Sequence, residues 1–118
     1  MAKDDMFVIM YKILAYLYEC MKLGKKANPE NISWDSEMFS IPEEYWKKIL
    51  VELIENGYIK DVYVVNSIGS RSGIKFGTDP SVTMAGVQFL EENSMMAKAK
   101  SVLGSSFQTV LSRLIGLL

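Results

Sequence analysis

The sequence predicts a mostly helical α+β fold, a winged helix-turn-helix domain over residues 1–103 with a C-terminal helical extension over 104–118. An apolar helix is followed by a polar stretch and a second helix that ends at Gly57. A β-branched and aromatic segment then turns back as a hairpin, and a further helix begins at Thr83. This order is typical of a winged helix, in which the hairpin is the wing.

The first helix is predicted over Met6 to Met21, where apolar residues recur at spacings of three and four on more than one face. We therefore expect it to be covered on several sides. The apolar run is too short to span a bilayer and no cleavage site follows, so neither a membrane anchor nor a signal sequence is expected. The polar loop from Gly24 to Asn31 comes next. A small basic cluster, expected to be solvated, consists of Lys22, Lys25 and Lys26.

Two helices joined by a tight turn are predicted for the helix-turn-helix, over Asp35–Phe39 and Ile41–Asn56. Ser40 and Glu43 have the spacing of a capping box at the start of the second helix. Gly57 can adopt the left-handed conformation that commonly ends a helix.

The wing is predicted from Tyr58 to Phe76, with a turn-rich tip between its two strands. A second turn is expected at Gly77–Pro80, because glycine, aspartate and proline cluster there. Thr83 is the expected N-cap of the next helix. The sequence leaves open whether that helix continues past Ser94 or restarts there.

The segment Gly104–Ser106 should interrupt the helical pattern before a final amphipathic helix. The apolar stripe of this final helix has two possible uses, packing on the first helix of the same chain or pairing with a second copy as a homodimer. A single arginine on the polar face argues against binding to a membrane surface. The stripe, which gives the self-association candidates, comprises Phe107, Val110, Leu111, Leu114, Ile115 and Leu118.

The composition excludes several classes of function. The 118 residues include no histidine and one cysteine, Cys20. Catalytic dyads and triads with an imidazole base are therefore excluded, and a zinc site lacks its usual ligands. Because no constellation of carboxylates, lysines or tyrosines stands out, we expect no enzyme, no metal and no cofactor. A lone cysteine favours a reducing cytoplasm.

Three runs of sequence resemble the YjcQ family: SIPEEYW at 40–46, LIENGYI at 53–59 and VTMAGVQFLEENSMM at 82–96. The third run is the most specific, and the resemblance covers most of the chain. It implies a small winged-helix-like protein with a phage or prophage setting. It transfers no catalytic residues to this chain.

The expected function is that of a DNA-binding or regulatory module of prophage origin. The alternative is a protein–protein interaction module, with itself or with a phage or host partner. The formal net charge is −1, so contact with double-stranded DNA must rest on a local basic patch. Lysines and glutamates interleave on the second helix and can pair with one another. The DNA-contact candidates are Lys47, Lys48, Lys60, Arg71 and Lys75.

Overall fold

Four α-helices and a two-stranded antiparallel hairpin form the described part of the chain, residues 1–66 and 73–116 of a computed structural model. The predicted α+β class is confirmed, and the order of elements is compatible with a winged helix carrying a C-terminal helix. The elements are α1 (Met6–Lys22), a 3₁₀ turn (Pro29–Ile32), α2 (Glu43–Glu55), β1 (Ile59–Val65), β2 (Gly73–Val82), α3 (Met84–Glu92) and α4 (Ser94–Leu114).

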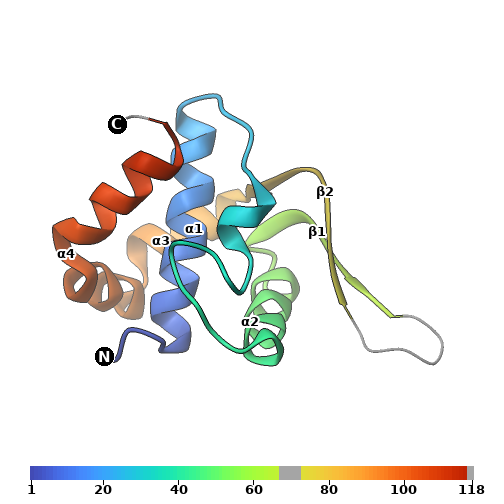
Figure 1. Ribbon diagram of the computed structural model, residues 1–118, viewed down its shortest axis with the longest axis horizontal. Coiled ribbons are helices and arrows are strands. Elements are labelled where there is room, and N and C mark those ends of the chain that lie inside the picture. Colours follow the sequence, from blue (N-terminus) through green and yellow to red (C-terminus); the bar gives the residue numbers. More distant parts are fainter. Residues whose placement is uncertain (67–72, 117–118) are drawn as a thin grey trace.

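Helix α1 runs through the middle of the protein, and α2, α3, α4 and the base of β2 pack around it (Figure 1). Its side chains Val8, Ile9, Ile13 and Leu14 have no exposed surface. The prediction of a helix covered on several sides is therefore confirmed. None of the described helices combines the length and the apolarity that a membrane crossing requires.

Residues 35–39 form an irregular loop, so the helix predicted there is wrong. An antiparallel bridge between Asp35 and Ser40 closes the loop. The ammonium group of Lys12, on α1, donates to the backbone carbonyl of Met38 at 2.7 Å. Distant residues thus bind the backbone groups of this segment, and a local sequence pattern does not contain that information.

Helix α2 begins at Glu43, two residues later than predicted, with Pro42 at its N-cap position and no side-chain capping bond. The predicted capping box is therefore wrong, because Ser40 is held in the bridge to the preceding loop. The end of the helix is as predicted, since Gly57 follows the C-cap residue with a φ of +73°.

Strand β2 continues through the residues that were predicted to form a second turn. Its pairing with β1 shifts between the pairs Lys60–Ser81 and Val62–Phe76. Four residues of β2, 77–80, therefore lie opposite the single residue Asp61. The glycine, aspartate and proline of this segment form a bulge within a continuing strand rather than a turn between elements.

The last two helices begin where side chains bind free backbone groups, and the second of them is divided at a glycine. Thr83 caps α3 as predicted, and its Oγ1 accepts the N–H of Gly86 at 3.0 Å. Asn93 caps α4 by accepting the N–H of Met95 at 2.9 Å, so the helix does restart after α3. Gly104, with a φ of +61°, divides α4 at the predicted interruption.

Candidate nucleic-acid interface

The hairpin projects from the helical body (Figure 1) and has one face directed away from the core. Asp61 has a left-handed conformation, with a φ of +59°. As a result the burial pattern of β1 changes phase at this residue: Ile59 and Val62 are both buried although they are three apart. Lys60 and Tyr63 are correspondingly both exposed, so they share the outer face.

The Asp61 carboxylate holds this change of phase in place. Its Oδ1 accepts the hydroxyl of Tyr63 at 2.8 Å, and its Oδ2 accepts the backbone N–H of Asp79 at 2.6 Å. The carboxylate lies against Gly77, where a Cβ atom would overlap it. The hydrogen bonds from Asp79 and Tyr63 lower the pKa of the Asp61 carboxyl from its ordinary value.

We expect the order of the hairpin bulge to depend on pH through Asp61. Because the folded-state pKa of Asp61 lies below its ordinary value, its contribution is complete above about pH 4 and is lost as the pH falls through the folded pKa. Acidification should therefore speed hydrogen exchange at the Asp79 amide, after correction for the intrinsic rate. The variant Asp61→Asn should remove this dependence. The variant Asp79→Asn should keep it, because the side chain of Asp79 takes no part in the two hydrogen bonds to Asp61. A response that survives Asp61→Asn would contradict the assignment.

The predicted wing lysines lie on the same outer face of the hairpin. Lys75 pairs in register with Tyr63, and Lys60 pairs with Ser81. Both lysines are exposed, and they lie on either side of the bulge. The structure therefore brings together two of the predicted contact residues, while Arg71 lies outside the described residues.

The two lysines predicted on α2 are poorly placed for contact with phosphate. The side chain of Lys47 is 17% exposed, and its Nζ lies 3.3 Å from Glu44 Oε1. Lys48 is exposed, but Glu43 and Glu44 occupy the first turn and Glu52 and Glu55 lie farther along the helix. Four acidic residues against two lysines would repel a nucleic acid from this helix.

The apolar stripe of the final helix is used within the chain. Phe107, Leu111 and Ile115 are buried, and the ring of Phe107 meets that of Tyr11 edge-on at a centroid distance of 5.9 Å. Val110 and Leu114 are half-buried against the same core, and Leu118 lies outside the described residues. Self-association through this stripe stays a prediction. It would require these side chains to leave their contacts with α1.

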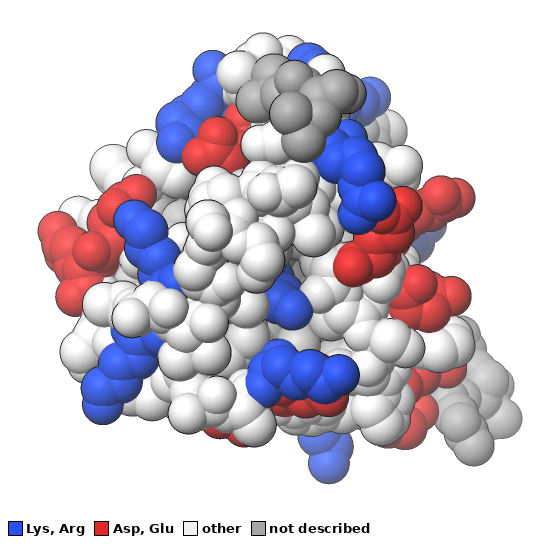
Figure 2. Space-filling model, turned by 60° about the vertical axis from the view of Figure 1, so that its left-hand side comes forward, with Lys and Arg blue, Asp and Glu red and all other residues white. Residues whose placement is uncertain are grey.

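The face on the α4 side of the molecule carries charges of both signs. In Figure 2, lysine and arginine side chains alternate with aspartate and glutamate around a largely uncharged middle. In its described part this face has no continuous basic surface that would match a phosphate backbone. The outer face of the hairpin is therefore the better candidate for contact with a nucleic acid.

Within residues 1–66 and 73–116, no group of cysteine, aspartate and glutamate side chains could hold a metal ion. The model of one protein family, described as YjcQ protein, matches residues 11–104 of the chain. Neither the curated proteins nor the solved structures include a match.

Proposed function

The chain belongs to the YjcQ protein family, and from this premise we propose that it is a winged-helix-like module that binds the backbone of double-stranded DNA through its hairpin. The observation that carries the proposal is the outer face of β1 and β2, on which Lys60 and Lys75 are both exposed. The role is one of binding and, on this proposal, involves no catalysis.

Contact of this kind follows from the shape and charge of the hairpin. It extends away from the helical body, so its outer face can approach a duplex without a clash from the helices (Figure 1). The residue directly after Lys60 is acidic, but the carboxylate of this Asp61 already accepts two hydrogen bonds within the hairpin. The lysines remain available as point charges for phosphate oxygens.

The mode of binding should be independent of base sequence. On this proposal α2 takes the place of a recognition helix, yet its acidic residues oppose entry into a groove. Contact is then confined to phosphate and sugar, which position a protein on DNA and do not read its sequence. We therefore expect weak binding that depends steeply on salt, with little difference between duplexes of equal length.

The test is a titration of a labelled duplex at low salt, repeated at rising salt, with the full chain and two variants. Lys75→Glu should weaken binding roughly tenfold and lower the slope of log K against log salt by about 1. Lys98→Glu, a change of the same charge at an exposed position of α4, should leave both quantities nearly unchanged. Absence of binding at about 50 mM salt, where phosphate contacts are strong, would refute the proposal.

A protein partner is the second candidate function, and exposed apolar side chains on the same hairpin favour it. Tyr63 and Val65, which share one face of β1, are 52% and 37% exposed, and Val64, on the other face, is 41% exposed. Large exposed apolar side chains that lie together mark interaction surfaces more often than isolated ones do. On this alternative the partner is a second copy of this chain or a phage or host protein. Measurement of the solution mass over a range of concentrations separates these two kinds of partner, because only pairing with a second copy raises the mass of the isolated chain.

The proposed setting is a cytoplasmic, prophage-encoded protein. Cys20 is buried, and burial raises the pKa of its thiol, so it is suited to a structural role in a reducing compartment. The prophage setting rests on the family resemblance alone.

A further inference from the structure

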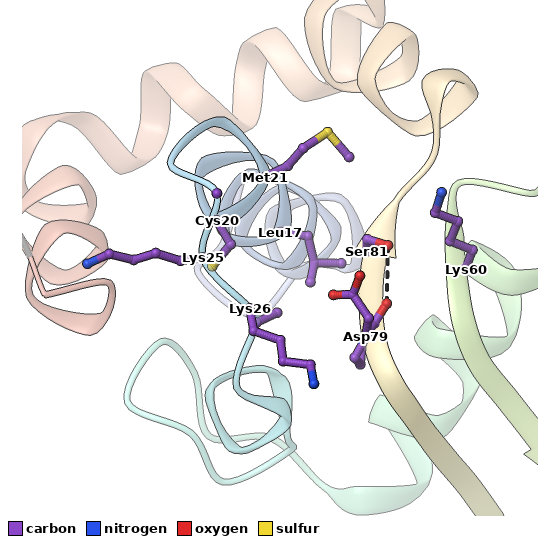
Figure 3. A pocket seen from close by; sticks show the side chains of 11 residues that line it. Leu17, Cys20, Met21, Lys25, Lys26, Lys60, Asp79 and Ser81 are labelled. Atoms are coloured by element: carbon purple, nitrogen blue, oxygen red, sulfur yellow. Dashed lines mark hydrogen bonds between the residues drawn. The ribbon is translucent and has the colours of Figure 1, made fainter.

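A pocket of about 620 Å³ lies between the C-terminal end of α1, the loop that follows it and the base of the hairpin (Figure 3). Leu17 and Met21 of α1 contribute apolar walls, and Pro80 of the bulge contributes another. The volume is in the range of sites for small organic molecules, about 300–1,000 Å³. It is far larger than an inorganic ion requires.

The charge of the lining is predominantly positive. Three lysines from two separate elements, Lys25, Lys26 and Lys60, line the pocket together with one carboxylate, that of Asp79. The lining thus has a formal net charge of two positive. A phosphate monoester near neutral pH carries about two negative charges, so it matches this lining better than a carboxylate does.

The lysines have different roles. The ammonium group of Lys25 is directed toward α4, where it donates to the backbone carbonyl of Ile115 at 2.7 Å (Figure 3). Lys26 and Lys60 form no hydrogen bond or salt bridge with another residue of the described ranges, although Lys26 lies within electrostatic range of the Asp61 carboxylate. Their ammonium groups can therefore turn toward an incoming anion, while Lys25 contributes fixed positive charge at the rim.

We infer that this pocket binds a small organic phosphate of about the size of a mononucleotide, with its phosphate near Lys26 and Lys60 and its apolar body against Leu17, Met21 and Pro80. The inference goes beyond the proposed contact with DNA, because Lys26 lies outside the hairpin and the ligand is a free molecule. A backbone phosphate of DNA has the same chemistry, so the experiment must separate the two sources.

The experiment follows the backbone amide signals of the full ¹⁵N-labelled chain during a titration with adenosine 5′-monophosphate at low salt. The amides of Lys26, Ala27, Lys60 and Ser81 should shift together and saturate, with a Kd of about 1 mM or below. Adenosine, which lacks the phosphate, should bind at least about tenfold more weakly, because charge-assisted hydrogen bonds to the ligand are lost.

A matched pair of variants tests the assigned residue. Lys26→Gln should weaken binding of the nucleotide about tenfold, whereas Lys98→Gln, on α4, should not alter it. Three results would each overturn the inference. They are an affinity for adenosine equal to that for the nucleotide, shifts around Lys98 equal to those in the pocket, and an affinity of Lys26→Gln equal to that of the parent chain. If a short duplex shifts the pocket amides and the free nucleotide does not, the phosphate belongs to DNA and the small-molecule site is refuted. Lys75→Glu, which tests contact with DNA, should leave nucleotide binding intact.

Discussion

Substitution of Gly86 by alanine is expected to destabilise the fold by about 3 kcal/mol, near the upper end of typical overpacking effects. Gly86 is buried in the first turn of α3. A Cβ atom there would overlap the backbone carbonyl oxygen of Tyr58 and lie 2.7 Å from Cγ2 of Val82. Since the nearest obstacle is backbone, no side-chain rotation can relieve the overlap, and α3 must move away from the base of the hairpin.

Urea denaturation followed by circular dichroism measures this loss, with Gly73→Ala as the matched control. Gly73, the first residue of β2, has no atom within 4 Å of the corresponding Cβ position and no positive φ. Its substitution should change the free energy of unfolding by less than about 1 kcal/mol, with a gain from the reduced freedom of the unfolded chain. Equal stability of Gly86→Ala and the parent would show that α3 does not approach the hairpin base this closely.

Replacement of Trp46 by alanine should cost about 3–5 kcal/mol, the range for truncation of a buried aromatic side chain. Trp46 is 5% exposed and joins three elements. Its Nε1 donates to the carbonyl of Ile32 at 2.8 Å, and its ring lies 6.3 Å from that of Phe76 on β2. Loss of this side chain leaves a cavity beneath the hairpin and an unpaired carbonyl in the 3₁₀ turn.

Two further variants separate packing from hydrogen bonding. Trp46→Phe keeps most of the apolar contact and loses the N–H donor, so we expect a cost of about 1–2 kcal/mol. Trp34→Ala removes the second tryptophan, which is 38% exposed, and should cost clearly less than Trp46→Ala because more of the Trp34 surface is already in contact with water. If the two alanine variants proved equally stable, the assigned role of Trp46 would be wrong.

The elements that the sequence predicts correctly are those defined by neighbouring residues. The apolar periodicity of α1, the cap at Thr83 and the break at Gly104 each depend on a few adjacent positions. The segment 35–39 was predicted incorrectly because its conformation depends on Lys12, which is more than twenty residues away. The glycine, aspartate and proline at 77–80 indicated a turn, but their partner is the left-handed Asp61 on the other strand.

The candidate site was predictable in composition and not in geometry. Lys60 and Lys75 were identified from their place in the wing, whereas the change of phase that puts both on one face depends on the φ of a single residue. The basic cluster after α1 was expected to be merely solvated. Nothing in the sequence indicates that Lys26 lies across a pocket from the base of β1, because the loop and the hairpin are far apart along the chain.

The position of α1 beneath α4 has a consequence for the nascent protein. Lys25 and Ile115, whose bond joins the loop after α1 to the C-cap of α4, are 90 residues apart in the chain. At about 5–20 residues per second, the ribosome needs roughly 5–18 s to make the intervening segment. During that time the side of α1 that Phe107 and Leu111 later cover is open to solvent and to other nascent chains. Translation speed and early chaperone contact should therefore influence how much of this protein reaches its native form.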